Sequence, residues 1–376
     1  MQKKLATTKT ILIAILLVIL ASCLTITLVL TCQQNVAQAE QPVIFADNLS
    51  SEDSSGNYPF MTVAEVTVSD EEELRKQFDE ATTGTVIKLG TDISIIQAST
   101  ISLTRDVELT LDLNGKTILG NGRSRVFYIS GNSATLNLID SSGNDSGKIT
   151  GGNGGMYMAQ GGTLNMYGGT ISGNISEYGA GANMDASFFN MYGGVISNNT
   201  ANYTGGGVYV KENSMFVMTG GTISQNFATN ADGNGGGGVL VNAASFNMQG
   251  GTISHNLSPK GGGVTLIAGE LTMSGTATIS GNNATQYGGG VWVNVSSSTL
   301  TMNGGTISYN KASYGGGVYN VGTFTMSGGE IEFNAASSSG GGVYSSVGSK
   351  FEMSGEAYHT TRRLTVVAYL LMACSQ

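Results

Sequence analysis

Cysteine and proline are scarce in this sequence. Of 376 residues, 3 are cysteine (Cys23, Cys32 and Cys374) and 3 are proline. The stretch from residue 40 to residue 357 contains no cysteine, so it can form neither a disulfide framework nor a cysteine-based zinc site. The few prolines and the lack of a strict G-X-Y period exclude a collagen-like chain.

Charge is scarce as well. Charged residues make up 11% of the chain, against about 25% in an average globular domain, and the net charge is −9. A long disordered chain needs high net charge and few apolar residues, which this composition does not provide. No arginine occurs between Arg125 and Arg362, so the clustered cations that bind phosphate backbones are missing. Nucleic acid is therefore not an expected partner.

The N-terminal segment indicates export. Lysines precede an apolar run at residues 11–30, and Ala37-Gln38-Ala39 offers a small-residue cleavage site. The run is longer than the about 7–15 residues of a cleaved signal and close to the about 20 that span a bilayer. Residues 1–39 are therefore interpreted as a signal peptide or as an N-terminal membrane anchor, with the body outside in either case. The segment Leu20-Ala21-Ser22-Cys23 also resembles a lipoprotein signal, although the residues after it stay apolar.

A linker and a short helix are expected next. Residues 40–62 are rich in Ser, Asp, Glu, Asn and Gly, which is typical of a flexible linker. Ser69 and Glu72 then have the spacing of a helix capping box. Apolar residues recur behind them at helical spacing, at Leu74, Phe78 and Ala81. We expect this amphipathic helix to cover the first coil of the all-β pattern that follows, within an N-terminal cap of residues 63–125.

Three signatures recur along residues 126–356. The run Gly-Gly-Gly-Val begins at Gly205, Gly236, Gly261, Gly288, Gly315 and Gly340. A Phe or Leu followed two residues later by Met occurs at Leu164, Phe189, Phe216, Phe246, Leu271, Leu300, Phe324 and Phe351. An Ile followed three residues later by Asn ends at Asn174, Asn199, Asn226, Asn256, Asn282, Asn310 and Asn334. Each repeat thus holds three short segments separated by Gly- and Asn-rich turns.

The period decides among the repeat folds. Successive Gly runs are 31, 25, 27, 27 and 25 residues apart, too short for a propeller blade of about 40 residues. The L-x-x-L-x-L-x-x-N signature of leucine-rich repeats is missing. A parallel β-helix remains, in which each repeat forms one coil and every strand pairs with its counterpart in the next coil. We predict about ten coils, with the Val, Phe/Leu, Met and Ile columns facing inward and the Asn column stacked at a turn.

Several segments also resemble a known family. The Glu73-Leu74 helix, the Gly84-Thr85-Val86-Ile87-Lys88-Leu89 strand, the Leu111-Asp112-Leu113-Asn114-Gly115 stretch and the repeats look like pectin-lyase-like right-handed β-helix proteins, particularly exported Gram-positive surface proteins. The resemblance covers about residues 63–356 and implies a right-handed solenoid. The Gly-Gly-Gly-Val and Ile-x-x-Asn pairs are more loosely similar to the repeats of chlamydial polymorphic membrane proteins, which are adhesins.

Catalytic residues typical of that superfamily are not found in the repeats. Pectate lyases use a basic residue beside calcium-binding aspartates, and polygalacturonases use clustered aspartates with a nearby His. From residue 151 to residue 357 the only Asp or His residues are Asp185, Asp232 and His255. Because acid/base catalysis needs two positioned titratable groups, we expect no catalytic residues. The spacings of metal-binding and phosphate-binding motifs are also missing, so we expect no metal site and no cofactor. A polysaccharide lyase or hydrolase remains the alternative function.

One outward column is the candidate binding site. The residues that follow the inward valines are Tyr209, Leu240, Thr265, Trp292, Tyr319 and Tyr344. The aromatic ones, Tyr209, Trp292, Tyr319 and Tyr344, would be spaced by about 4.8 Å along a solvent face and could stack on sugars. The competing interpretation is that aromatic residues favour strands and cover their neighbours.

The C-terminal tail at residues 357–376 departs from the repeat, and it either caps the last coil or is out-of-frame sequence. As a whole the sequence predicts a non-catalytic, cell-surface or secreted β-helix protein, an adhesin-like module or a structural stalk. Its expected partners are host or cell-wall glycans or surface proteins, with the membrane contacted only through the N-terminal segment. A non-functional fragment is a third interpretation.

Overall fold

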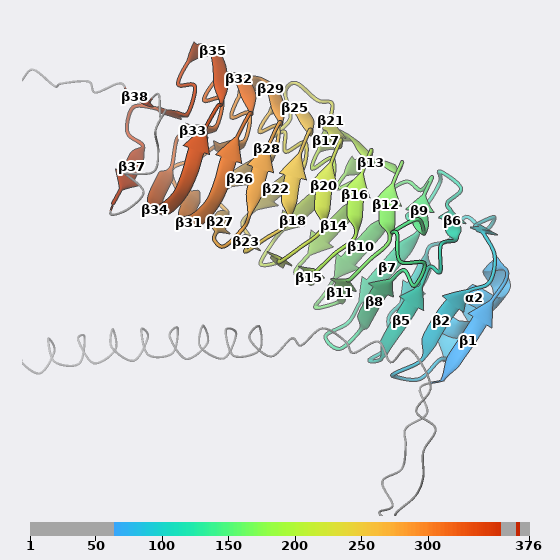
Figure 1. Ribbon diagram of the computed structural model, residues 1–376. Helices are drawn as coiled ribbons and strands as arrows, with labels where there is room; N and C mark the ends of the chain where they lie inside the picture. Colours follow the sequence, from blue (N-terminus) through green and yellow to red (C-terminus); the bar gives the residue numbers. More distant parts are fainter. Residues whose placement is uncertain (1–63, 355–365, 369–376) are drawn as a thin grey trace, which may run out of the picture. The chain divides into compact units, whose positions relative to one another are not determined.

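A parallel β-solenoid of about ten turns forms the described part of the chain (Figure 1). The computed structural model describes residues 64–354 and the backbone of residues 366–368. Within this part there is one helix, α2 (Glu71–Glu80), at the N-terminal end. The predicted all-β parallel β-helix with a short N-terminal helix is therefore confirmed. The segments at residues 1–39 and 40–62, and the tail at 357–376 apart from the backbone of 366–368, lie outside the described residues.

The described strands form three parallel sheets. Sheet A consists of β1 (Glu65–Val68), β2 (Val86–Leu89), β3 (Ile93–Ser94), β5 (Glu108–Asp112), β6 (Thr117–Leu119), β8 (Thr135–Ile139), β9 (Lys148–Thr150), β11 (Thr163–Met166), β12 (Thr170–Ser172), β15 (Phe188–Met191), β16 (Val195–Ser197), β19 (Met215–Met218), β20 (Thr222–Ser224), β23 (Ser245–Met248), β24 (Thr252–Ser254), β27 (Glu270–Met273), β28 (Thr278–Ser280), β31 (Thr299–Ser308), β34 (Thr323–Glu332) and β37 (Lys350–Met353). Sheet B consists of β4 (Ile101–Leu103), β7 (Phe127–Ser130), β10 (Met156–Ala159), β14 (Ala182–Asp185), β18 (Val208–Lys211), β22 (Val239–Asn242), β26 (Val264–Ile267), β30 (Val291–Val293), β33 (Val318–Asn320), β36 (Val343–Ser345) and β38 (Val366–Ala368). Sheet C consists of β13 (Ile175–Tyr178), β17 (Thr200–Thr204), β21 (Phe227–Ala228), β25 (Leu257–Lys260), β29 (Asn283–Tyr287), β32 (Lys311–Tyr314) and β35 (Ala335–Ser339).

From β10 onward each coil visits the sheets in the same order, whereas the earlier coils have no strand in sheet C. The chain leaves sheet B at β18, enters sheet A at β19, continues along sheet A at β20, crosses to sheet C at β21 and returns to sheet B at β22. The asparagine signature lies between sheet A and sheet C, and the Gly-Gly-Gly run lies between sheet C and sheet B. Because every strand pairs with the corresponding strand one coil later, the three signatures become three continuous columns.

The core is built from the predicted inward columns. In the coil from β18 to β20, Val208, Phe216, Met218 and Ile223 are all fully buried. The equivalent residues of neighbouring coils stack directly on them, as in the ring pair Phe216–Phe246, whose centroids are 4.5 Å apart. Alternate residues of a strand face the same side, so a column that is apolar in one coil must be apolar in the next. The predicted core ladders are therefore confirmed.

The predicted asparagine ladder is also confirmed. The Asn199 side-chain amide donates from Nδ2 to Oδ1 of Asn226 over 3.0 Å and to the carbonyl of Ile171 over 2.9 Å. The backbone N–H of Asn199 donates to the same Asn226 Oδ1 over 3.1 Å. The pattern repeats from coil to coil until Asn334 accepts from Asn310. From Asn174 to Asn310 these side chains are buried with their polar atoms bonded, so the turn into sheet C is held by directional contacts.

Helix α2 covers the N-terminal end of the solenoid. Leu74 and Phe78 are buried, and the Phe78 ring lies 5.4 Å from that of Phe127 in sheet B. The expected Ser69–Glu72 capping box is wrong by one residue, because Asp70 is the N-cap and accepts from the Glu73 N–H over 2.8 Å. Asp and Ser cap helices about equally well, so the sequence offered two adjacent candidates.

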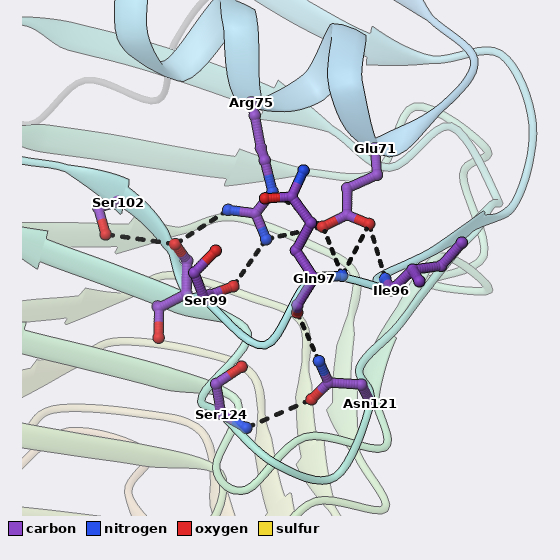
Figure 2. Close-up of polar contacts among 9 residues, drawn as sticks. Glu71, Arg75, Ile96, Gln97, Ser99, Ser102, Asn121 and Ser124 are labelled. Carbon is purple, nitrogen blue, oxygen red and sulfur yellow. Dashed lines mark hydrogen bonds and ion pairs between the residues drawn. The ribbon is translucent and has the colours of Figure 1, made fainter.

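Hydrogen bonds fix α2 to the loop before β4 (Figure 2). Arg75 donates to Glu71 and to the backbone carbonyls of Ser99 and Thr100. Glu71 in turn accepts from the backbone N–H of Ile96 over 2.6 Å. Burial alone would raise the pKa of Glu71, but the bonds from Ile96 and Arg75 lower it below its usual value. The carboxylate is thus a structural link between the helix and the first coils.

At the C-terminal end, β38 pairs in parallel with β36 and so continues sheet B by one strand. In residues 64–354 there is no helix with the length and apolarity needed to span a membrane.

Candidate functional site

The Gly-Gly-Gly run makes a re-entrant corner on the outside of the solenoid. A Cβ at Gly288, whose φ is +62°, would lie 2.8 Å from the Trp292 Cα, and a Cβ at Gly205 would lie 2.9 Å from the Tyr209 Cβ. The end of each sheet C strand therefore lies against the outward face of sheet B. Only glycine allows this close approach with a positive φ. Outward side chains of sheet B consequently meet side chains of sheet C.

The outward column of sheet B is longer than the sequence suggested. Strand register extends it from Tyr344 and Tyr319 back through Tyr209 to Tyr157 and Tyr128. Tyr128 and Tyr157 were missed because no Gly-Gly-Gly-Val run precedes them. The available signal was a tyrosine between two apolar residues, as in Phe127-Tyr128-Ile129.

Aromatic side chains from both sheets meet at this corner. We use the name aromatic corner for the outward sheet B residues Tyr209, Trp292, Tyr319 and Tyr344 together with the sheet C residues Tyr178, Tyr203, Tyr287 and Tyr314. Tyr178 stacks on Tyr203 at 5.4 Å and lies 6.1 Å from Tyr209. Further along the axis, the Tyr287 ring lies 6.0 Å from Trp292 and 4.8 Å from Tyr319. All four residues predicted from the sequence therefore lie in the aromatic corner, in two groups.

The two groups are separated by two coils in which the residue of the outward column is buried and not aromatic. Leu240 and Thr265 occupy the same outward register between Tyr209 and Trp292, and both are buried. Trp292 itself is 7% exposed, because Tyr287 and the Lys260 side chain, whose Nζ lies 5.7 Å from the ring centroid, cover it. The predicted continuous strip is therefore interrupted at the centre.

Ring orientation further limits what the sheet B column presents. Tyr319 and Tyr344 are 4.9 Å apart with an interplanar angle of 7°, so each occupies a face of the other. Such a stack offers ring edges to solvent, whereas sugars stack on ring faces. Within the aromatic corner, exposed tyrosine surface comes mainly from sheet C, where Tyr203 is 44% exposed and Tyr178 is 38% exposed. The sequence did not predict these sheet C residues. Their contacts cross from sheet C to sheet B at the Gly-Gly-Gly run, and such contacts leave no periodic pattern in the sequence.

The packing also affects ionisation. Burial, together with the neighbouring phenols Tyr344 and Tyr287, raises the pKa of Tyr319 above its ordinary value. Tyr157, nearer the N-terminal end, donates to Asp185 over 3.3 Å, and Asp185 pairs with Lys211 at 2.8 Å. Burial and the Asp185 charge raise the pKa of Tyr157. These phenols therefore stay neutral over a wider pH range than free tyrosine.

Other titratable residues are dispersed. Asp232 and His255 are both exposed, and within residues 64–354 no hydrogen bond or ion pair joins them. In the same part of the chain, no group of three or more His, Cys, Asp or Glu residues lies close enough to hold a metal ion.

Comparison with known proteins adds no relative. No family model, no curated protein and no solved structure matches this chain.

Proposed function

We propose that the chain is an extracellular, adhesin-like module in which a rigid β-solenoid presents a lateral binding surface for glycans. The β-solenoid fold suits surface and structural proteins of this kind. Export is supported by the basic and apolar N-terminal sequence, and the pectin-lyase-like resemblance agrees with an all-parallel solenoid. The assignment of a ligand depends on the aromatic corner.

Stiffness supports a role as a stalk. From Asn174 to Asn334, each coil bonds to the next through three sheets and through an asparagine ladder. Bending the solenoid would separate these bonded groups on one side. A stack of this kind holds a binding surface at a fixed distance from its attachment point, which a flexible linker cannot do.

The aromatic corner supports glycan binding, and it is the observation on which this proposal depends. Tyr178, Tyr203 and Tyr314 are partly exposed at or near the ends of sheet C strands, next to sheet B. Tyrosine combines an apolar ring with a hydroxyl group, a combination that suits the mixed surface of a sugar. The repeats around them are rich in Ser, Thr and Asn and poor in charge, which matches a ligand with many hydroxyl groups.

The proposal is tested with the full chain and a panel of plant, mucin and cell-wall polysaccharides. Retention on the insoluble polymer and release of new reducing or unsaturated ends are measured together. We expect retention without cleavage, and an at least tenfold weaker retention for Tyr203→Ala combined with Tyr314→Ala. The control is Tyr309→Ala, because Tyr309 is 59% exposed but lies at the asparagine turn outside the aromatic corner.

Two results would contradict the proposal. Cleavage would favour the lyase or hydrolase alternative. Equal loss of retention in the control and in the double variant would show that any exposed tyrosine contributes, and that the aromatic corner is not the site.

A further inference from the structure

A surface cavity lies at the N-terminal end of the aromatic corner. Its volume is about 410 Å³, and its lining includes Arg123, Ser124, Arg125, Glu177 and Tyr178. Tyr178 belongs to the aromatic corner, so the cavity and the corner are continuous. The first coils thus bring two arginines together in a chain whose repeats contain none.

Arg125 differs from the other half-buried arginines of the described region. Arg75 donates to Glu71 and to two backbone carbonyls, and Arg105 donates to the carbonyls of Phe78 and Ala81. Within residues 64–354, Arg125 makes no hydrogen bond and no ion pair. Its guanidinium lies 4.4 Å from the centre of the Tyr157 ring, which holds it in place.

This arrangement leaves a guanidinium with no acceptor. Arg125 Nη1 is buried and has no hydrogen-bond partner, although a guanidinium carries five N–H donors. Burial lowers the pKa of Arg125 below its ordinary value, because the charged form loses hydration that no acceptor replaces. An oxyanion forms short, bidentate hydrogen bonds with such a group.

Neighbouring groups can add further donors. The Ser124 hydroxyl and the Asn153 side-chain amide line the same cavity, and neither makes a hydrogen bond within residues 64–354. Arg123 is exposed at the rim and adds a second positive charge. Glu177, also exposed, is the one acidic residue of the lining and opposes an anion.

We propose that this cavity binds an oxyanion, the carboxylate, sulfate or phosphate group of a ligand, which accepts hydrogen bonds from the Arg125 guanidinium. This inference goes beyond the proposed function and does not depend on the ligand being a glycan. If the ligand is one that also contacts the aromatic corner, the cavity anchors its charged end and Tyr178 contacts the adjoining part.

The test is equilibrium dialysis of the full chain against radiolabelled sulfate, phosphate and acetate, each used alone. We expect saturable binding of at least one of these anions with a Kd of about 1 mM or tighter. The anion that binds best shows whether the site suits a planar carboxylate or a tetrahedral group. Dialysis measures binding directly, so its result is not affected by the general stabilisation that sulfate and phosphate give to any folded protein.

Variants identify the group that binds. Arg125→Gln should weaken binding at least tenfold, and Arg125→Lys should weaken it less, because lysine keeps the charge and loses the planar fork. Lys148→Gln is the matched control, since it removes one exposed positive charge from another part of the solenoid and should leave binding unchanged. Glu177→Gln should tighten binding a few-fold.

The proposal is overturned if none of the three anions binds saturably, or if Arg125→Gln binds as the unaltered chain does while its circular dichroism spectrum is unchanged. If Arg125→Gln does not fold, the other two variants still test the proposal. It requires that Arg125→Lys weaken anion binding and that Glu177→Gln tighten it. Failure here would leave the glycan assay intact, since that assay depends on Tyr203 and Tyr314.

Discussion

Sheet A and sheet C are made by the same repeat but differ in what they bury. Inward residues of sheet A are large, such as Phe216, Met218 and Ile223, whereas those of sheet C are Ala or Ser, such as Ala228 and Ser258. Sheet C has no room for more, because the glycine run of the adjacent coil lies against its backbone. A Cβ at Gly206 would be 2.7 Å from the backbone of Phe227.

Outward residues show the reverse trend. Sheet C exposes Ile175, Phe227 and Leu257 in one register, and its tyrosines border the aromatic corner. Stability therefore comes mainly from the large inward side chains of sheets A and B. Sheet C buries little, so its outward side chains contribute less to stability. The comparison indicates that binding residues can vary on sheet C at little cost to folding.

The largest expected effect is on the phenylalanine ladder. Phe216→Ala removes a fully buried ring that stacks on Phe189 and Phe246, and should lower the free energy of unfolding by about 3–5 kcal/mol. Phe227→Ala in sheet C removes the same atoms from a side chain that is 37% exposed. This variant should lower the free energy of unfolding by about 0.5 kcal/mol. Urea unfolding of both variants measures the difference. Similar losses in the two would show that sheet C contributes to the core as much as sheet A does.

A smaller effect is expected from the asparagine ladder. Asn226→Ala leaves the Asn199 donors without their shared acceptor and the Ile196 carbonyl without its donor, so we expect a loss of about 2–3 kcal/mol. Asn202→Ala changes an exposed asparagine of sheet C and is the control. An unfolding midpoint in urea that is equal for the two variants would mean that water replaces the ladder at no cost.

The smallest effect concerns ionisation in the aromatic corner. The folded-state pKa of Tyr319 is raised, so its contribution to stability is complete below about pH 10, the ordinary tyrosine pKa, and is lost as pH rises toward the folded value. The unfolded chain releases the proton first, which favours unfolding. Tyr319→Phe should therefore flatten the fall of the unfolding free energy above this pH, with Tyr309→Phe as the exposed control. An unchanged slope would mean that Tyr319 ionises as freely as an exposed tyrosine.

The sequence predicted those parts of the fold that repeat. Val208, Phe216, Ile223 and Asn226 could be placed because a column that recurs at one register in successive coils must stack on itself. The helix N-cap was wrong by one residue because Ser69 and Asp70 are both capable caps and nothing repeats there. Local ambiguity was resolved by tertiary contacts, here the Glu71 bonds to the loop before β4.

The candidate site was predicted only in part, and for a physical reason. The register placed Tyr209, Trp292, Tyr319 and Tyr344 on one outward column, but their exposure depends on neighbours across the glycine corner. Tyr287 and Lys260 cover Trp292, and neither belongs to the column. The Arg125 cavity lies before the regular Gly-Gly-Gly-Val runs begin, where no repeated motif aligns one coil with the next.

The asparagine ladder also makes the length of the solenoid adjustable. Each ladder residue accepts from the asparagine before it and donates to the one after it, so a coil inserted anywhere in the ladder brings the acceptor that one neighbour needs and the donors that the other needs. Duplication of one repeat would extend the stack by about 4.8 Å and leave every existing bond type in place. Reach can thus change in small, equal steps without redesign of the lateral surface.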